Sequence, residues 1–522
     1  MKKTFNITGV CYPQLHYMMD NSKKIDSVMA LVEGGAYFII NRPRQYGKTT
    51  TLHFLTDRLQ EAEAYLPIAL NFQGIDGSWH ESDSSFAARF VNQLADFFEL
   101  QQPDIFQFLQ TEKAVVADMD SLSKLITKLV RQTPEKLVLL IDEVDASSNY
   151  LPFLSFLGML RTKFLARMQP QHSTFYSVVL AGVHDIKSLK YKLRDPEAAQ
   201  YNSPWNIAAD FEVEMSFNPA EIAPMLADYA AAEGVTMDIP ALAGRLYYHT
   251  SGHPFLVSKL CKNIAEKILP NRAAQDCWTP DDVEEAVRLL LRENNTNFDS
   301  LIKNLENNQD LYDLVFRIVI DGAAIAFNQY NATIYQGVLY GIFKRNGNVR
   351  IHNRVYEQLI YDYMSSNLEV KMRTDAYNFE NQFHLPDNQL DVQKILLKFQ
   401  QFLHEQYSKK DQAFLERQWR LVFLAFVKPI INGKGYDFKE VQVSQERRLD
   451  IVITYLQHKY IIELKRWYGE AAHQEGLTQL ADYLDLQHQT KGYLVIFDDR
   501  KEKQQASKSV VHQGKEIFAV WV

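Results

Sequence analysis

The feature that most constrains the fold is a short apolar run that leads into a basic, glycine-containing loop. Residues 36–40 read AYFII, and the following residues 41–50 read NRPRQYGKTT. An aromatic-rich apolar run of this length predicts a buried strand, and the spacing from Thr49 to about Leu59 predicts a helix. Strand, loop and helix in this order are the setting that a phosphate-binding loop requires.

A phosphate-binding loop works through backbone N–H groups that converge on oxygens at a helix N-terminus. Gly47 lets the backbone come close to a phosphate, Lys48 reaches the β- and γ-phosphates, and Thr49 places its hydroxyl group on Mg²⁺. The usual first glycine of GxxxxGK(S/T) falls at Arg42, so the match is degenerate, and either Arg42 or Arg44 could face the phosphates. The predicted nucleotide-binding residues of the loop are Arg44, Gln45, Tyr46, Gly47, Lys48, Thr49 and Thr50.

A second apolar run, residues 137–141, ends in the acidic pair Asp142 and Glu143. This pattern predicts a Walker B strand, in which Asp142 holds Mg²⁺ through water and Glu143 activates the attacking water. The alternative is a strand that ends in a solvated acidic turn, since Asp145 follows. Further apolar runs lie at 66–71 and 176–181. Strands that alternate with helices predict an open α/β sheet, here with ATP and Mg²⁺ as cofactors.

The composition limits the class of protein. A chain of 522 residues is too long for one hydrophobic core, and 46% hydrophobic with 23% charged residues is ordinary for a soluble globular protein. The net charge of -8 means that any nucleic-acid contact must be local, or must wait for a metal to cancel carboxylate charge. The three cysteines lack CxxC spacing, and we see neither a signal peptide nor a long apolar run, so a cytoplasmic protein without a membrane span is expected.

The C-terminal part carries a second charged pattern. Asp450 opens an apolar run, and Glu463 and Lys465 stand in the run YIIELK, two residues apart and therefore on one face of a strand. If the turn between the runs centres on residues 457–458, Asp450 lies opposite Lys465 and shares that face. Carboxylates that converge on Mg²⁺, with a lysine near the phosphate, suit metal-dependent cleavage of phosphodiesters. An edge strand with solvent-facing charges is the alternative, which explains Asp450 less well.

The N-terminal motifs resemble a known family. The strings at 5–9 (FNITG), 16–18 (HYM) and 41–50 look like the AAA-ATPase-like family of bacterial and archaeal proteins, which is similar to AAA+ and STAND-type ATPases. That family often carries a C-terminal nuclease domain of the PD-(D/E)XK superfamily. The resemblance implies that His16 and Tyr17 flank the adenine.

The same resemblance implies further elements. A sensor is expected near Gly182 to His184, although a structural role is the alternative for this histidine. Residues 250–256 (TSGHPFL) resemble the GxP element of STAND lid domains, or else form a Gly-Pro helix start. Arg194 is one of several arginine-finger candidates.

The C-terminal pattern resembles PD-(D/E)XK nucleases, with Asp450 followed by Glu463-x-Lys465. The superfamily often adds a glutamate from a preceding helix, for which Glu416 is the candidate, and a Gln-x-x-x-Tyr pair, here Gln479 and Tyr483. Four-residue spacing places that pair on one helical face, although a solvated face is the alternative for Gln479. The predicted catalytic residues are Glu143, Asp450, Glu463, Lys465 and Gln479, and the predicted metal ligands are Thr49, Asp142, Asp450, Glu463 and Glu416.

Together these patterns predict an α/β multidomain protein: a P-loop parallel-sheet ATPase, a helical lid, a winged-helix-like region and a PD-(D/E)XK α/β nuclease fold. The predicted boundaries are 1–215 (ATPase), 216–295 (lid), 296–370 (winged-helix-like), 371–398 (linker) and 399–522 (nuclease). The predicted function is an ATP-regulated nuclease that cleaves DNA in preference to RNA, with foreign or mobile DNA as the target by family analogy. Alternatives are a nucleotide-dependent switch or adaptor that binds nucleic acid or a partner protein without cleavage, and an ATP-binding scaffold that forms homo-oligomers.

Overall fold

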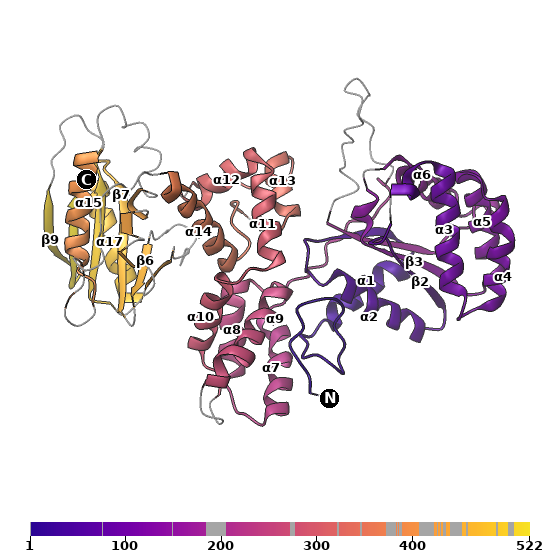
Figure 1. The fold of residues 1–522 in the computed structure, drawn as a ribbon, viewed down its shortest axis with the longest axis horizontal. Coiled ribbons are helices and arrows are strands. Elements are labelled where there is room, and N and C mark those ends of the chain that lie inside the picture. Colours follow the sequence, from indigo (N-terminus) through magenta and orange to yellow (C-terminus); the bar gives the residue numbers. More distant parts are fainter. Residues whose placement is uncertain are drawn as a thin grey trace, which may run out of the picture. The chain divides into compact units, whose positions relative to one another are not determined.

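The computed structural model of the chain, drawn in Figure 1, forms two compact units. The first unit comprises Met1–Leu301 and Tyr335–Phe343, and the second comprises Ile302–Ile334 and Lys344–Val522. The residues that the structure describes are 2–75, 77–148, 150–183, 205–271, 277–320, 323–344, 347–371, 383, 385, 389–406, 422–424, 426–427, 430–431, 435–438, 451–455, 458–486, 489–498 and 506–522. Among these residues, no helix combines the length and the apolar character that crossing a membrane needs.

The centre of the first unit is a four-stranded sheet in the order β1-β4-β3-β2, with every neighbouring pair parallel. The strands are β1 (Tyr37–Asn41), β2 (Tyr65–Asn71), β3 (Lys136–Asp142) and β4 (Ser177–Gly182). The middle of each strand is mostly apolar because both faces of the sheet are covered: Tyr37 and Ile39 face one core, and Phe38 and Ile40 face the other. The predicted open α/β sheet is confirmed.

Helices cover both faces of this sheet. One face packs against α1 (Ser22–Glu33) and α2 (Lys48–Glu61), and the other against α3 (Asp83–Phe98), α5 (Met119–Gln132) and α6 (Leu151–Ala166). The helix α4 (Pro103–Glu112) packs beside α3. The apolar stripe of each helix at 3.6-residue spacing accounts for its burial.

A helical region follows the sheet within the first unit. Its helices are α7 (Pro219–Glu233), α8 (Ile239–Thr250), α9 (Pro254–Asn263), α10 (Pro280–Leu291) and the first turns of α11 (Thr296–Glu306). The helix α7 begins with a capping box, in which the side chains of Asn218 and Glu221 each accept the backbone N–H of the other residue, and it ends at Gly234 with φ 67°. A helix also begins at Pro254, where the string at 250–256 offers a Gly-Pro helix start.

The second unit starts with helices and ends with a sheet. Its helices before the sheet are the rest of α11, α12 (Gln309–Val319), the start of α13 (Ala332–Leu339), α14 (Arg354–Lys371) and α15 (Val392–Gln406). An antiparallel bridge joins Ala326 to Asn348, near the predicted β-wing. The helix α15 begins inside the segment 371–398 that its polarity predicts as a linker, because Ile395, Leu396 and Phe399 recur at helical spacing and are fully buried.

The C-terminal sheet is mixed and has six described strands in the order β5-β6-β7-β8-β10-β9. The strands are β5 (Gly435–Phe438), β6 (Ile451–Tyr455), β7 (His458–Arg466), β8 (Lys491–Phe497), β9 (Ser507–His512) and β10 (Lys515–Trp521), with α17 (Glu470–Leu486) between β7 and β8. Neighbours are antiparallel except for the parallel pairs β7–β8 and β8–β10. The predicted strand, strand, helix, strand order is present, and β9 and β10 were not predicted.

The register between β6 and β7 differs from the prediction. Ile451 pairs with Ile462, and Tyr455 pairs with His458, so the ladder is shifted by two residues from one that would place Asp450 opposite Lys465. The pairing is centred between residues 456 and 457, one residue earlier than the predicted centre at 457–458. Because side chains alternate with a period of two, a two-residue shift leaves every described side chain on its predicted face.

Candidate functional site

The predicted phosphate loop connects the end of β1 to the start of α2. Gln45 has φ 58° and Gly47 has φ 76°, so two of its residues adopt left-handed backbone angles. A Cβ atom at Gly47 would meet nothing within 4 Å, which shows that the backbone angle, rather than space, favours glycine there. Left-handed turns directly before a helix of fourteen residues direct N–H groups toward one point, where an anion is favoured.

Lys48 lies within this loop. Its Nζ donates hydrogen bonds of 3.0 Å to the carbonyl oxygens of both Arg42 and Pro43, and the side chain is buried. Burial lowers the pKa of Lys48, while the carboxylates of Glu143, Asp145 and Asp142 act in the opposite direction. An ammonium group has three hydrogens, so the two loop bonds leave one to donate to a phosphate.

Thr49 and Asp142 come together at the carboxyl end of the sheet. The hydroxyl group of Thr49 donates to Asp142 Oδ2 at 2.7 Å, although 93 residues separate them in the sequence. The backbone N–H of Glu143 donates to the other carboxylate oxygen, Oδ1, at 2.9 Å. A hydroxyl and a carboxylate oxygen are ligands that Mg²⁺ prefers, so this pair fits a magnesium ion.

Glu143 sits beside the pair in an unusual conformation, with φ 56° and ψ 39°. A left-handed angle at a residue other than glycine is uncommon, and such outliers cluster at functional sites. Burial raises the pKa of Glu143, Lys48 lowers it, and Asp142 and Asp145 raise it further. A carboxylate with a raised pKa beside a phosphate loop has the character of a general base.

Asp145 is a functional candidate that the sequence did not single out. Its Oδ2 accepts the backbone N–H of Val183 at 2.6 Å, so it is not part of a solvated turn. A Cβ atom at Gly182 would lie 2.9 Å from Asp145 Oδ1, which explains the glycine at the end of β4. Asp145 thus fastens the ends of β3 and β4 together. His184 and Arg194 lie outside the described residues.

The two loop arginines have different environments. Arg42 donates from Nη2 to the carbonyl oxygen of Val213 at 2.7 Å, and its guanidinium lies 5.0 Å from the ring centre of Phe211. Arg44 is exposed, and its positive charge lowers the pKa of both Lys48 and Glu143. Of the two arginines that the sequence left open, Arg42 is thus held by Val213 and Phe211, and Arg44 is the exposed one.

Tyr46 turns toward the helical region. Its ring lies 4.4 Å from that of His253 in an edge-on arrangement, and its hydroxyl group is 3.3 Å from Ser216 Oγ. Burial raises the pKa of Tyr46. The Gly-His-Pro string therefore contacts the phosphate loop, besides beginning α9.

The residues predicted to flank the adenine, His16 and Tyr17, lie in the N-terminal segment before α1. The ring of Tyr17 is buried and lies 4.9 Å from Phe5 and 5.3 Å from Tyr229. His16 Nδ1 accepts the backbone N–H of Tyr12 at 2.9 Å, and burial lowers the pKa of His16. Thr50 Oγ1 accepts the backbone N–H of Cys11 at 3.3 Å, which links this segment to α2.

The candidate nuclease residues on β7 and α17 are also in contact. Glu463 is 1% exposed and forms an ion pair of 2.9 Å with Lys465 Nζ, which also donates to Gln479 Oε1 at 2.8 Å. Tyr483, the other member of the predicted helical pair, is buried in the core between α17 and the sheet. Among the described residues no three His, Cys, Asp or Glu side chains are grouped as a metal site. Asp450 and Glu416 lie outside the described residues.

The fold and the loop define the class of protein, which is an AAA-like P-loop ATPase. Residues 14–362 match the family model described as the AAA-like domain, and the chain therefore belongs to that family. The match ends before the C-terminal sheet. No curated protein matches the chain.

Three solved structures resemble the chain at low identity. The Walker-type ATPase PABY2304 of Pyrococcus abyssi has a TM-score of 0.46 and 12% identity, over 68% of this chain and 99% of that one. The ADP form of the Aeropyrum pernix ORC2 protein has 0.37 and 13%, over 69% and 97%. The Aeropyrum pernix ORC1 protein in complex with DNA has 0.30 and 12%, over 67% and 94%. Because each TM-score lies below 0.5, no ligand or partner is transferred from these proteins.

Proposed function

We propose that the chain binds and hydrolyses ATP with Mg²⁺ at the loop between β1 and α2. The observation that carries the proposal is the 2.7 Å contact of Thr49 with Asp142 beside the buried amine of Lys48. Lys48 donates to the β- and γ-phosphates, and Thr49 and Asp142 hold Mg²⁺. The metal, when bound, neutralises charge that develops on the phosphate oxygens. Glu143 accepts the proton of the attacking water.

The C-terminal residues 399–522 are proposed as a nuclease domain of the PD-(D/E)XK type. The support is Glu463, a buried carboxylate in a largely apolar strand. It pairs with Lys465, whose amine also donates a hydrogen bond to Gln479. Glu463 is nearly fully buried whereas its partner Lys465 is 32% exposed, and burying a charge is costly unless it is paired and hydrogen-bonded. A function that uses the charges accounts for the cost.

Roles follow from the chemistry of these groups. Glu463, Asp450 and Glu416 are proposed to hold the metal ion of the nuclease, and Lys465 to stabilise charge at the phosphate. Gln479 accepts a hydrogen bond from Lys465 and so limits the positions of its amine. A metal ion would also balance the buried charge of Glu463.

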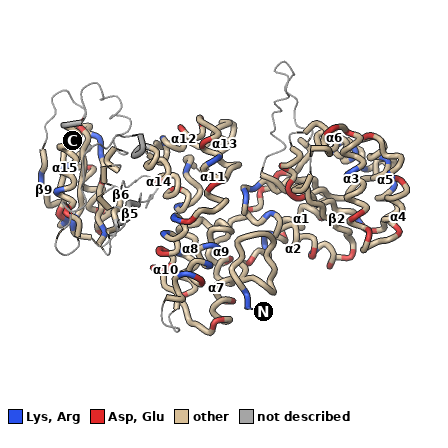
Figure 2. Tube along the Cα trace, viewed as in Figure 1, with Lys and Arg blue, Asp and Glu red and all other residues tan. Residues whose placement is uncertain are grey.

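We propose DNA as the substrate in preference to RNA, with ATP gating the nuclease. The other proposed domains are the ATPase (residues 1–215), the lid (216–295) and a winged-helix-like domain (296–370), followed by a linker (371–398). Figure 2 shows basic and acidic residues interspersed along the described trace, which fits local rather than bulk attraction to nucleic acid. A cytoplasmic location and homo-oligomer formation belong to the same proposal.

The test incubates the full chain with plasmid and linear DNA, and separately with RNA, in Mg²⁺ or Mn²⁺, with and without ATP. Glu463→Ala should abolish cleavage, and Lys48→Ala should abolish its dependence on ATP. Glu516→Ala is the matched control, since Glu516 is an exposed carboxylate on β10 of the same sheet. Cleavage that Glu463→Ala leaves unchanged would refute the nuclease. No cleavage by a protein that binds ATP would instead favour the switch or adaptor.

A further inference from the structure

The outer side of the phosphate loop is covered by residues that follow it by hundreds of positions. Pro43 packs against Gly341, and Gln45 Nε2 lies 3.5 Å from Thr296 Oγ1. These residues all belong to the first unit, which includes Tyr335–Phe343. The loop is therefore not built by β1 and α2 alone.

The contact of Gly341 with Pro43 depends on the missing side chain. A Cβ atom at Gly341 would lie 2.6 Å from Pro43 Cγ and 3.0 Å from Pro43 Cβ, closer than non-bonded atoms approach. Gly341 follows α13, has φ +73° and is buried, and its N–H donates to the carbonyl oxygen of Val338 at 3.0 Å. The turn at Gly341 is thus fixed by a hydrogen bond to α13, and its backbone packs directly against Pro43.

Pro43 also contributes to the site itself, because its carbonyl oxygen accepts a hydrogen bond from Lys48 Nζ. Any movement of Pro43 therefore changes the position of the amine that meets the phosphates. Gln45 has a left-handed backbone angle, which residues other than glycine seldom adopt. Contacts with the surrounding structure are needed to hold this conformation. Its side-chain amide finds a partner in the hydroxyl group of Thr296.

We propose that Gly341 and Thr296 are positioning residues of the nucleotide site: they hold Pro43 and Gln45 so that the loop is ready to receive phosphate. This inference rests on the proposed binding of ATP at the loop. Coupling between two sites is reciprocal. Bound nucleotide therefore stabilises the packing of residues 335–343 against the loop. The stability of this segment, which the sequence predicts to belong to a separate domain, thus depends on whether nucleotide is bound.

The first experiment measures ATP and ADP affinity of the full chain by calorimetry. Gly341→Ala should weaken both affinities by about tenfold, because the added methyl group displaces Pro43. Gly347→Ala is the matched control: Gly347 also has a left-handed φ of +57°, but a Cβ there meets nothing within 4 Å. Thr296→Val should weaken binding by about threefold, and Thr296→Ser, which keeps the hydroxyl group, should restore it.

A second measurement is hydrogen exchange at residues 335–343. Adding ATP should slow exchange there in the wild type and in Gly347→Ala, but not in Lys48→Ala. If Gly341→Ala fails to fold, the threonine pair and this exchange measurement decide the matter. The positioning role would be overturned if Gly341→Ala or Thr296→Val bound ATP with wild-type affinity. It would also be overturned if ATP left the exchange of residues 335–343 unchanged in a chain that binds ATP. Neither result would affect the proposed ATPase. Absence of Lys48-dependent ATP binding in the wild type would overturn the proposed ATPase as well.

Discussion

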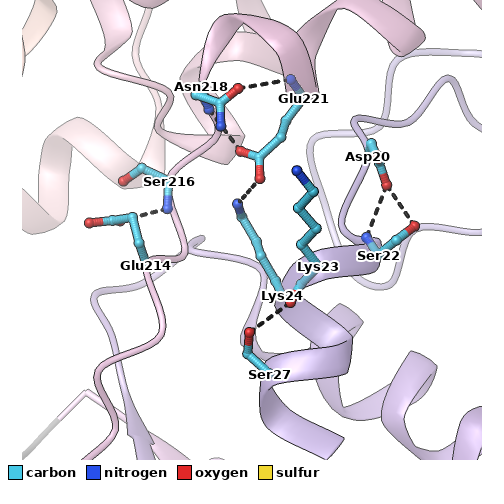
Figure 3. Close-up of polar contacts among 9 residues, drawn as sticks. All are labelled: Asp20, Ser22, Lys23, Lys24, Ser27, Glu214, Ser216, Asn218 and Glu221. Carbon is cyan, nitrogen blue, oxygen red and sulfur yellow. Dashed lines mark hydrogen bonds and ion pairs between the residues drawn. The ribbon is translucent and has the colours of Figure 1, made fainter.

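Replacing Lys24 by methionine tests a buried ion pair that joins the first helix of the ATPase sheet to the helical region. Figure 3 shows the side chain of Lys24, on α1, reaching Glu221 at the start of α7. The Nζ–Oε1 distance is 2.8 Å, and the two side chains are 7% and 14% exposed. Lys24 Nζ also lies 4.6 Å from the ring centre of Phe217.

Methionine keeps the length of the lysine side chain but removes the charge, which leaves the carboxylate of Glu221 without its cation. Removing one partner of a fully buried pair costs about 3–5 kcal/mol. Glu221 retains some exposure and still accepts the N–H of Asn218 at 2.9 Å, so we expect a loss of about 2–4 kcal/mol in the free energy of unfolding.

The assay is urea unfolding followed by circular dichroism, with Lys23→Met as the control. Lys23 is the adjacent residue and is exposed, so its replacement should change stability by less than about 0.5 kcal/mol. The double variant with Glu221→Gln should recover part of the loss, because the amide still accepts the capping bond without a buried charge. Equal stability of Lys24→Met and Lys23→Met would refute this reasoning.

Three other predictions concern the base, a buried lysine and a glycine. Glu143→Gln should retain ATP affinity and lower the hydrolysis rate by about 10²–10⁴-fold in a phosphate-release assay, and normal turnover by the variant would contradict the role of Glu143 as a base. Because burial raises the pKa of Glu143, the wild-type hydrolysis rate should begin to fall, as the pH is lowered, at a pH above the ordinary glutamate pKa of 4.5. Lys163 is 1% exposed, donates to Ser123 O and Thr127 Oγ1, and has its pKa lowered by burial to about 8. Between about pH 8 and 10.5 the unfolded chain binds more protons at this residue, so urea unfolding should show wild-type stability rising by about 2–3 kcal/mol relative to Lys163→Met, and parallel pH profiles would count against it. Gly252→Ala places a Cβ against the carbonyl oxygen of Phe217, where there is no space for it, and should cost about 2–5 kcal/mol in thermal unfolding. Gly234→Ala has a similar φ of +67° with nothing within 4 Å and should cost about 1–2 kcal/mol; equal losses would show that the backbone angle alone matters.

Local patterns were sufficient for the centre of the ATPase site. An apolar run followed by Gly47, Lys48 and Thr49 predicts strand, loop and helix, and an acidic pair after another apolar run predicts Asp142 at the edge of the same sheet. Parallel strands place their carboxyl ends along one edge, so the meeting of Thr49 with Asp142 at 2.7 Å follows from topology.

Longer-range partners were not predictable in this way. The choice between Arg42 and Arg44 depends on Phe211 and Val213, which come some 170 residues later and take up Arg42. The sequence was compatible with Asp145 in a solvated turn, because no residue near it in the sequence indicates that it accepts a hydrogen bond from the N–H of Val183. The spacing of Glu221 after Asn218 predicts a helix cap, but its second use by Lys24 has no local signal.

In the C-terminal sheet, too, some features were predictable from local sequence and others were not. The two-residue period alone places Glu463 and Lys465 on one face, and the contact of Lys465 with Gln479 follows once α17 packs on that face. The predicted register of β6 and β7 differs from the observed one by two residues, because the register depends on where the chain turns and the pairing centres one residue earlier than predicted.

By itself, then, the sequence determined the strand, loop and helix of the phosphate loop and the shared face of Glu463 and Lys465, since hydrophobic period and backbone preference act over a few residues. The tertiary structure alone decided which segments cover that loop, with Gly341 against Pro43 and Thr296 beside Gln45. Those contacts join residues some 250–300 positions apart, and they form only where the fold leaves space for the bare backbone of Gly341 and brings the hydroxyl group of Thr296 within reach of Gln45.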